Sequence, residues 1–358
     1  MRYKRLLFVS TPVGPLGGGL GGGVELTINN TAKALRQRGY LVEVVAPKNS
    51  KLESLVIHQI GGQLQKSIQE QSRADPIIIF DDSVLANMWQ YIREIEHNYD
   101  LIVNFSFDWL SLYLTPFLKK PVAHLISMSS LSNVIDSTIA KTLKQFPNTV
   151  AVHGMDQSKT FSFWEQLLCL SNGLDLSQYN FCAKPENYMA WVGRISPEKG
   201  LEDAIAAAQI SKIPLRIFGL IQDREYFDRV CSIYPDAPVE YRGFLSTPNL
   251  QKQLRLSRAL LMTPRWVEAF GNVAIEAMAC GVPVVAYRRG GTSETVQDGK
   301  TGYLVEPDNI SALVLAISRI DEIDRAICRK QAELLYSLES WGKRLEFWFD
   351  LIAEKENA

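Results

Sequence analysis

The sequence predicts an α/β protein with two doubly wound domains, each a parallel sheet covered by helices. Three observations favour this fold class. Short apolar runs rich in β-branched residues alternate with stretches of helical periodicity, which is typical of parallel strands joined by crossover helices. The alternation pauses near residue 176 and then starts again. With 358 residues, the chain also suits two domains of about 150–200 residues each.

The first half contains the elements expected of one sheet. A strand over 5–11 is followed by a glycine-rich loop and a helix from about Val24 to Arg38. Gly39 ends this helix, because glycine is favoured at the left-handed position that follows a helix. Further strands are expected at 41–47, 76–80, 100–107, 121–127, 149–154 and 167–173.

The second half repeats this alternation. Its strands are expected at 188–194, 215–219, 239–244, 259–264, 282–288 and 302–305. The segment 176–188 lacks periodicity and contains Pro185, so it is the expected linker. We therefore place one domain at residues 1–176 and a second at residues 177–339.

The last helix, expected over 340–358, needs a surface to cover. It carries Trp341, Leu345, Trp348 and Phe349 at helical spacing. This apolar face is expected to dock back on the first domain.

The composition excludes several classes of protein. There are 38 Lys and Arg residues against 39 Asp and Glu, a net charge of −1, which argues against a nucleic-acid-binding protein. The first apolar run stops at Pro12, so we expect no signal peptide, and no run reaches the roughly 20 apolar residues that span a bilayer. The five scattered cysteines are expected to be buried thiols. Together these features predict a cytoplasmic protein without stable membrane insertion.

The segment WVGRISPEKG (191–200) carries the first candidate site. Gly193 ends a strand, and Arg194 and Lys199 stand five residues apart around the following turn. A phosphate needs fixed cations, and Arg and Lys supply a planar fork and a point charge. A solvated loop with two exposed cations is an equally good interpretation of the spacing alone.

A second candidate site lies in EAFGNVAIEAMACGVPVVAYRRGGTSE (268–294). Glu268 is in a loop before a helix that starts near Gly271, and Glu276 lies inside that helix. Carboxylates can accept hydrogen bonds from sugar hydroxyls and from a ribose diol. Glutamates are often just solvated helix residues, but Glu276 has small and apolar neighbours and therefore needs a partner.

Together these segments resemble glycosyltransferase family 4, the retaining enzymes of the GT-B fold. The similar segments are GGGVELTINNTAKALRQRGYLVEVV, LSNGLDLSQYNF, VGRISPEKG, the two glutamates of EAFGNVAIEAMACGVPVV, and GGTSETVQDGKTGYLVEPDN. The resemblance implies two Rossmann-like domains facing across a cleft. The first, with the helix 340–358, would bind the acceptor, and the second, 177–339, would bind a nucleotide sugar.

The resemblance also implies roles for matching residues. The implied donor-binding residues are Gly22, Gly23, Arg194, Lys199, Gly243, Phe244, Glu268, Ala269, Phe270, Gly271, Asn272 and Glu276. In this set Arg194 and Lys199 hold the diphosphate, Glu268 the transferred sugar and Glu276 the ribose. Gly243 and Phe244 correspond to the turn that holds the base, and Gly22 and Gly23 approach the diphosphate from the first domain. His124 falls where the family often has a histidine at the reaction centre, so the implied catalytic residues are Arg194, Lys199, Glu268 and His124.

The expected chemistry needs no cofactor and no metal. Transfer with retained anomeric configuration, as the resemblance implies, requires the cations to neutralise the leaving diphosphate. Asp81 and Asp82 could suggest a metal site, but an acidic pair after a strand is more often a turn or a helix cap.

The acceptor is suggested by the stretch FVSTPVGPLGGGLGGGVEL, which resembles cyanobacterial pteridine glycosyltransferases of the UDP-glucose:tetrahydrobiopterin type. A glycine loop over 14–23 could fold over a flat heterocycle, and a carboxylate such as Asp108 could pair with its guanidine-like edge. Phe107 and Trp109 are equally well explained as core residues. The candidate acceptor residues are Val13, Asn104, Phe107, Asp108, Trp109 and His124.

Three other functions remain open on the sequence. A glycosyltransferase acting on a lipid or polysaccharide would share the donor half of the chain but usually has a basic amphipathic surface. A nucleotide-sugar epimerase would need no acceptor, and a nucleotide-sugar sensor would have no turnover. The oligomeric state is not predicted.

Overall fold

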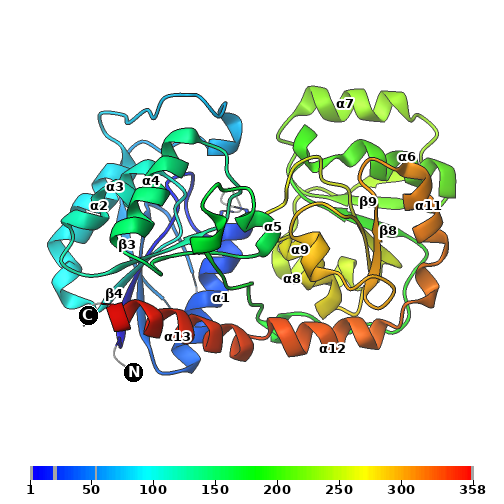
Figure 1. Cartoon of the computed structure of the whole chain (residues 1–358). Helices are drawn as coiled ribbons and strands as arrows, with labels where there is room; N and C mark the ends of the chain where they lie inside the picture. Colours follow the sequence, from blue (N-terminus) through cyan, green and yellow to red (C-terminus); the bar gives the residue numbers. More distant parts are fainter. Residues whose placement is uncertain (1–2, 19–21, 53–54, 356–358) are drawn as a thin grey trace. The chain divides into compact units, whose positions relative to one another are not determined.

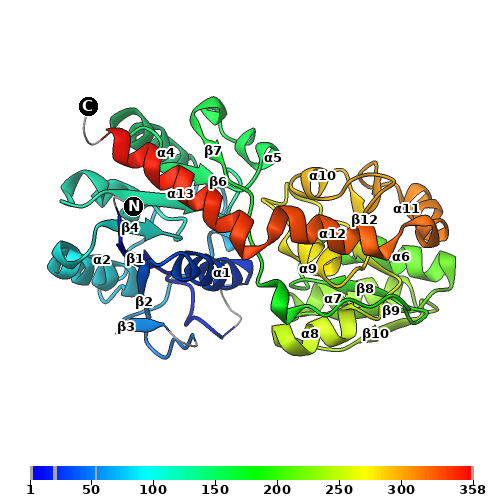
Figure 2. The same ribbon diagram turned by 90° about the horizontal axis from the view of Figure 1, so that it is seen from below.

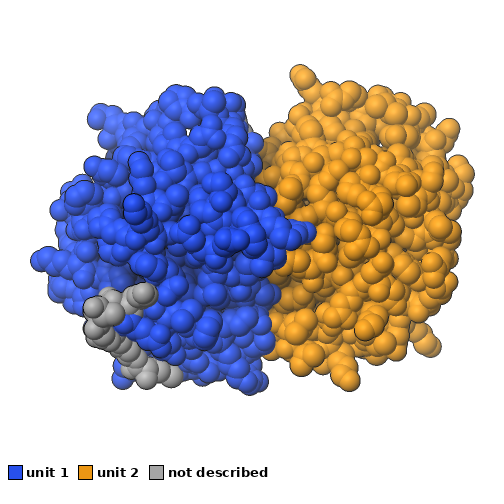
Figure 3. Space-filling view, viewed as in Figure 1, with its two compact units in different colours: residues 1–173, 338–358 blue, residues 174–337 orange. Residues whose placement is uncertain are grey.

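The computed structural model describes residues 3–18, 22–52 and 55–355, which form two compact units (Figure 3). Unit 1 comprises Met1–Gly173 and Leu338–Ala358, and unit 2 comprises Leu174–Ser337. The sequence suggested boundaries at 176/177 and 339/340. Each unit contains a parallel sheet with helices against it, so the predicted α/β class with two Rossmann-like domains is confirmed.

Unit 1 is built on a seven-stranded sheet of order β3-β2-β1-β4-β5-β6-β7. Its strands are β1 (Arg5–Val9), β2 (Leu41–Pro47), β3 (Val56–Ile60), β4 (Leu101–Asn104), β5 (Val122–Ile126), β6 (Val150–Val152) and β7 (Leu168–Cys169). Its α-helices are α1 (Gly23–Gln37), α2 (Val84–Ile95), α3 (Trp109–Leu114), α4 (Asn133–Gln145), α5 (Met155–Ser158) and α13 (Leu338–Lys355). The strand order changes direction between β1 and β4, and in open α/β sheets ligands bind beside such a switch point.

The C-terminal helix α13 belongs to the core of unit 1. Figures 1 and 2 both show it beside α1. Trp341 and Trp348 are 0% exposed and join the cluster that contains Phe8 and Ile28. The indole of Trp341 also donates to Thr31 Oγ1 at 3.1 Å. The prediction that this helix docks on the first domain is therefore confirmed.

One predicted strand is wrong. Residues 76–80 (PIIIF) form an irregular segment, and Ile78 is 65% exposed. The edge position beside β2 is taken instead by β3, which the sequence did not suggest and which pairs with β2 in parallel. An apolar run can line a cavity as readily as it can join a sheet. Residues 76–80 line a cavity.

Unit 2 has a six-stranded sheet of order β10-β9-β8-β11-β12-β13. Its strands are β8 (Met189–Val192), β9 (Leu215–Phe218), β10 (Val239–Tyr241), β11 (Ala259–Met262), β12 (Val284–Tyr287) and β13 (Gly302–Val305). Its α-helices are α6 (Leu201–Ser211), α7 (Arg224–Ile233), α8 (Thr247–Leu254), α9 (Asn272–Ala279), α10 (Thr292–Thr295), α11 (Ile310–Ser318) and α12 (Arg325–Tyr336). Here the switch point lies between β8 and β11, which pair directly.

Two expectations from the composition can be compared with the structure. All five cysteines are free thiols, but only Cys280 and Cys328 are buried, and Cys169, Cys182 and Cys231 are partly exposed. The expectation of five buried thiols is thus wrong for three of them. Among the described residues, no helix is both long and apolar enough to cross a membrane.

Candidate active site

Lys199 and Glu268 meet at the switch point of unit 2. Lys199 lies in the connection after β8, and Glu268 lies in the loop after β11, the next strand in the sheet. The Lys199 ammonium is 2.6 Å from Glu268 Oε2, and both side chains are largely buried. Trp266 completes the group, because its ring lies under the ammonium at 4.8 Å and its indole N–H donates to the same carboxylate oxygen at 3.2 Å.

Two glycines allow these loops to approach so closely. Gly200 has φ +63°, and a Cβ there would lie 1.9 Å from the carbonyl oxygen of Thr263. Gly290, after β12, has φ +71°, and a Cβ there would lie 2.4 Å from the carbonyl oxygen of Glu268. Only glycine fits these left-handed, crowded positions. The loops after β8, β11 and β12 therefore pack on one another backbone to backbone.

Arg194 lies in the same connection as Lys199 but has different partners. Its guanidinium donates to Gln222 Oε1 at 2.8 Å and to Glu198 Oε1 at 3.4 Å. The Ser196 hydroxyl donates to that Glu198 oxygen at 2.7 Å. These contacts hold Arg194 on the side of β8 that faces β9.

The other predicted donor residues of unit 2 lie at the same edge of the sheet. Gly271 is the N-cap of α9, so Asn272 is the first helical residue, and Ala269 and Phe270 before it are buried. Gly243 follows β10, and its carbonyl oxygen accepts from the Gly219 amide at 3.0 Å. The side chain of Phe244 is 51% exposed.

Glu276 is buried on α9, and the partner it requires is Tyr179. The tyrosine hydroxyl donates to Glu276 Oε1 at 2.8 Å. Burial raises the pKa of Glu276 to about 7, although the hydrogen bond from Tyr179 lowers it. A carboxyl group with such a pKa is poised between its two protonation states near neutral pH.

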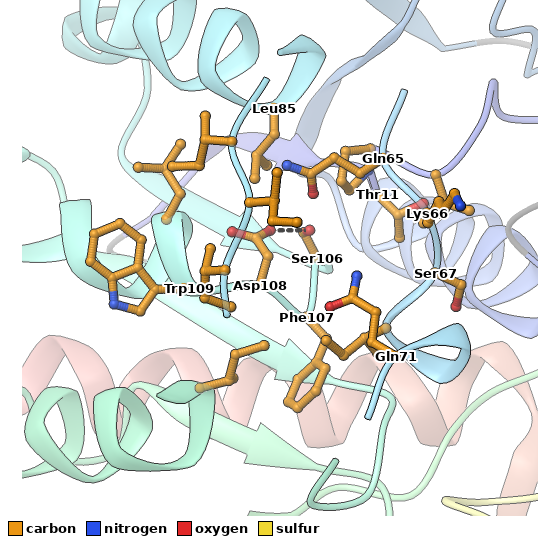
Figure 4. A pocket seen from close by; sticks show the side chains of 18 of the residues that line it. Thr11, Gln65, Lys66, Ser67, Gln71, Leu85, Ser106, Phe107, Asp108 and Trp109 are labelled. Atoms are coloured by element: carbon orange, nitrogen blue, oxygen red, sulfur yellow. Dashed lines mark hydrogen bonds between the residues drawn. The ribbon is translucent and has the colours of Figure 1, made fainter. Parts of the chain in front are cut away.

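Unit 1 contains a cavity of about 660 Å³ at its own switch point. Thr11, Pro12 and Val13, which follow β1, line one side, and residues 105–110, which follow β4, line another. The third wall is the segment 63–80, which Arg73 fastens to α4 through Asn133 and Asp136. Figure 4 shows Gln65, Gln71 and Asp108 around this cavity, with Trp109 to one side.

Four of the predicted acceptor residues, Val13, Phe107, Asp108 and Trp109, line this cavity. The Asp108 carboxylate caps α3 by accepting from the Ser111 amide at 3.1 Å, and it also accepts from the Ser106 hydroxyl. Burial raises its pKa.

Asn104 and His124 are not among the lining residues. His124 lies in the middle of β5, where Nδ1 accepts from Asn104 Nδ2 at 3.1 Å and Nε2 lies 2.9 Å from Thr115 Oγ1. Burial lowers its pKa to about 3. His124 is therefore a buried neutral imidazole within the network that joins β4, β5 and α3.

A second histidine contacts the cavity wall indirectly. The hydroxyl of Ser127, a lining residue, lies 2.9 Å from His153 Nε2, and His153 Nδ1 lies 2.9 Å from the carbonyl oxygen of Ser171. Since a carbonyl only accepts, Nδ1 carries the proton and Nε2 accepts from Ser127. The Ser127 hydroxyl is therefore oriented as a donor to His153.

Sequence reasoning missed Trp266, Tyr179, Ser127 and the cavity glutamines. The segment GGQLQKSIQEQS (61–72) offered a signal, because four glutamines in twelve residues are unusual for a plain linker. No local pattern signals Tyr179, whose partner is 97 residues away.

The glycine loop is only partly described. Residues 19–21 lie outside the described part of the chain. On one side of this gap, Leu16 is held by Ser50 and Lys51, and the Gly17 amide donates to Glu25 Oε2 at 2.8 Å. On the other side, Gly22 and Gly23 are exposed at the start of α1.

The acidic pair after residue 80 has no metal-site geometry in the described ranges. Asp82 Oδ1 accepts from the side-chain Nδ2 of Asn87 at 2.8 Å, and Ser83 caps α2. Over the same ranges, no group of three or more His, Cys, Asp or Glu side chains could hold a metal ion.

Residues 177–334 match the family model described as Glycosyl transferases group 1. The chain is 25% identical, over 85% of its length and 83% of the relative's, to D-inositol 3-phosphate glycosyltransferase of Arthrobacter sp. strain FB24. It is 24% identical to the lipopolysaccharide 1,2-N-acetylglucosaminetransferase of Salmonella typhimurium, over 97% of this chain and 99% of that one.

Solved structures share the fold over nearly the whole chain. Sucrose-phosphate synthase from Thermosynechococcus elongatus superposes with a TM-score of 0.75 at 20% identity, covering 98% of this chain and 100% of that one. Anabaena HepE in complex with UDP and glucose gives 0.75 at 18% identity, covering 96% and 99%. Residues 177–334 thus match the glycosyltransferase group 1 family, the chain has the GT-B fold, and together these similarities support a glycosyltransferase that transfers a sugar from a nucleotide sugar.

Proposed function

We propose that this protein transfers a hexose, glucose in the first instance, from a UDP-sugar to a small pterin acceptor with retention of anomeric configuration. The bond between the anomeric carbon and the diphosphate breaks, a bond to an acceptor oxygen forms, and UDP leaves with the proton that the acceptor hydroxyl loses. No metal or other cofactor takes part in the proposed reaction.

The donor half of the proposal is supported by the residues after β8 and β11. Arg194 and Lys199 are the cations available to the leaving diphosphate, and Glu268 is the carboxylate available to the sugar hydroxyls. The ion pair of Lys199 with Glu268 holds both side chains in place before any ligand binds, so little reorganisation is needed during transfer.

The acceptor half is supported by one observation above all, the 660 Å³ cavity at the switch point of unit 1. Its volume lies in the usual range for small-molecule sites. Phe107 and Ile77 supply apolar surface, while Gln65, Gln71 and Asp108 supply amide and carboxylate groups. A pterin needs both kinds of surface, because it has flat apolar faces and an edge of alternating donors and acceptors.

A donor-by-acceptor screen tests this function. The purified chain is incubated with UDP-glucose or another nucleotide sugar, and with a pterin, a simple sugar or a lipid. UDP release and product mass are measured, and NMR gives the anomeric configuration of the product. We expect UDP release that depends on the pterin and an α-linked product from an α-linked donor.

Other results of the screen would replace parts of the proposal. Product formed only with a lipid acceptor, together with sedimentation on anionic liposomes, would overturn the pterin assignment and favour a membrane-associated transferase. Conversion of UDP-glucose to another UDP-hexose without acceptor would identify an epimerase. Binding of UDP-glucose without turnover on any acceptor would leave only a sensor.

A further inference from the structure

Tyr179 and Glu276 form a buried pair in unit 2. Tyr179 follows the 3-10 helix Leu176–Gln178, and Glu276 lies on α9, so the two come from separate elements. The tyrosine hydroxyl donates to Glu276 Oε1 at 2.8 Å, and the residues are 3% and 6% exposed. The aromatic ring and the carboxylate are thus held in a single arrangement.

The backbone around this pair is fixed by a third element. Arg329 on α12 donates from Nη1 to the carbonyl oxygen of Tyr179 at 2.7 Å and to that of Ala279 at 2.6 Å. One guanidinium therefore joins the segment that carries the tyrosine to the end of the helix that carries the glutamate. Both backbone segments that carry the pair are thus held to α12.

The carboxylate of Glu276 is incompletely satisfied inside the protein. Within residues 3–18, 22–52 and 55–355, Tyr179 is its one hydrogen-bond partner. A buried carboxylate with a single partner is unfavourable, since each oxygen can accept about two hydrogen bonds. The second oxygen of Glu276 therefore has acceptor capacity left for the donors of a ligand.

We propose that Tyr179 is a positioning residue for donor binding, which holds one oxygen of Glu276 and leaves the other for the ribose diol of the UDP-sugar. This inference rests on the proposed function, in which Glu276 binds the ribose. It adds a residue that acts through Glu276 and does not itself touch the donor.

The electrostatic surroundings favour this role. Burial raises the pKa of Glu276 to about 7, and the Tyr179 hydroxyl lowers it. The charged or titratable groups around the pair are Asp175 before the 3-10 helix, Arg255 after α8, Cys280 after α9, and Arg325 and Arg329 on α12. Without the hydroxyl, Glu276 would stay protonated to a higher pH, and a protonated carboxyl accepts fewer hydrogen bonds from a diol.

The test is the binding of UDP and of 2′-deoxy-UDP to Tyr179→Phe, measured by calorimetry from pH 6 to pH 8.5. At pH 7 we expect roughly tenfold weaker UDP binding than in the wild type, the size of one hydrogen bond to a charged group. The pH at which the association constant for UDP reaches half of its maximal value should be higher in Tyr179→Phe than in the wild type. The preference for UDP over 2′-deoxy-UDP should shrink, because Glu276 reads the ribose hydroxyls.

Two other variants serve as references. Tyr287→Phe is the matched control, because Tyr287 in β12 is also fully buried and donates to a helix carboxylate, Asp203, at 2.6 Å. It should bind both nucleotides as the wild type does. In a Glu276→Gln background, Tyr179→Phe should cause no further loss, since the tyrosine acts through the carboxylate.

The outcomes separate the inference from the proposed function. If wild-type protein does not bind UDP, the proposed donor is wrong and this inference with it. If wild type binds UDP and Glu276→Gln weakens it, the donor assignment stands. An unchanged affinity, pH profile and nucleotide preference in Tyr179→Phe would then overturn the role of Tyr179 alone.

Discussion

Lys199 illustrates how one side chain can serve both structure and chemistry. Its ammonium is neutralised by Glu268 and lies over the Trp266 ring, so it is held in place without ligand. A preorganised cation stabilises developing negative charge, and no free energy is lost in ordering its side chain during the reaction.

Lys199→Ala tests this role directly. We expect UDP release to fall by about 10²-fold, because the loss of one preorganised charge at a reaction centre has that effect, while the fold persists. Lys300→Ala is the matched control, since Lys300 is an exposed lysine in the turn before β13, at the opposite edge of the sheet. A Lys199→Ala enzyme as fast as wild type would remove Lys199 from the site.

The side-chain amide of Gln65 is a candidate contact for the acceptor in the cavity of unit 1. Gln65→Leu keeps the volume of the side chain but removes its amide, so we expect the KM for a pterin to rise by about tenfold while the KM for UDP-glucose stays constant. Gln145→Leu, an exposed position at the end of α4, should change neither value. Equal pterin KM values for the two variants would show that the amide does not contact the acceptor.

At the scale of elements, α13 is part of unit 1 although it lies last in the chain. Its face with Trp341, Leu345 and Trp348 completes the same core as β1 and α1. The apolar spacing of this helix was readable in the sequence. Its partner surface was only inferred, because apolar spacing specifies that a face must be covered and not by what.

Trp341→Ala should destabilise unit 1 by about 3–5 kcal/mol, as large-to-small changes in a close-packed core do. Urea denaturation followed by the fluorescence of the remaining tryptophans measures the change. Phe347→Ala on the same helix is the control, because Phe347 is 56% exposed, and it should cost less than about 0.5 kcal/mol. Similar costs for both would mean that α13 does not dock through Trp341.

At the scale of the whole molecule, the two units should respond to pH in opposite directions. In unit 1, burial lowers the pKa of His124 to about 3 and that of His153 to about 4. In unit 2, burial raises the pKa of Glu276 to about 7. Both kinds of shift arise because a buried site disfavours the charged form.

For unit 1 the stability should fall as the pH falls. The unfolded chain binds protons at His124 and His153 below about pH 6.5, while the folded chain does not until pH 3–4. The free energy of unfolding should therefore be lower at pH 5.5 than at pH 7.5. The decrease is at most about 1.4 kcal/mol for each histidine and each pH unit. In the double variant His124→Asn, His153→Gln, the free energy of unfolding should depend less steeply on pH. A dependence as steep as that of the wild type would contradict its assignment to these two histidines.

For unit 2 the sign is reversed. Between the ordinary glutamate pKa of 4.5 and about 7, the unfolded chain has lost the Glu276 proton and the folded chain retains it. The contribution of Glu276 to stability is present below pH 4.5 and is lost as the pH rises through 7. In Glu276→Gln, the stability of unit 2 should therefore decrease less over this pH range than in the wild type. Calorimetry measures the difference.

The features that depend only on neighbouring residues can be predicted from the sequence. The alternation of strands and helices, the left-handed position at Gly39 and the location of Lys199 and Glu268 in loops at strand ends are local properties of periodicity and turns. The misassigned strand at 76–80 is also local in origin, because a short apolar run fits a strand or a cavity wall equally well.

Which of these features come into contact depends on the tertiary fold. The order of strands places Lys199 beside Glu268, gathers residues 11–13, 63–80 and 105–110 around one cavity, and joins Tyr179 to Glu276. It also places His124 inside the sheet and away from the cavity lining. These arrangements depend on contacts between residues far apart in the chain, which no local pattern of side chains encodes.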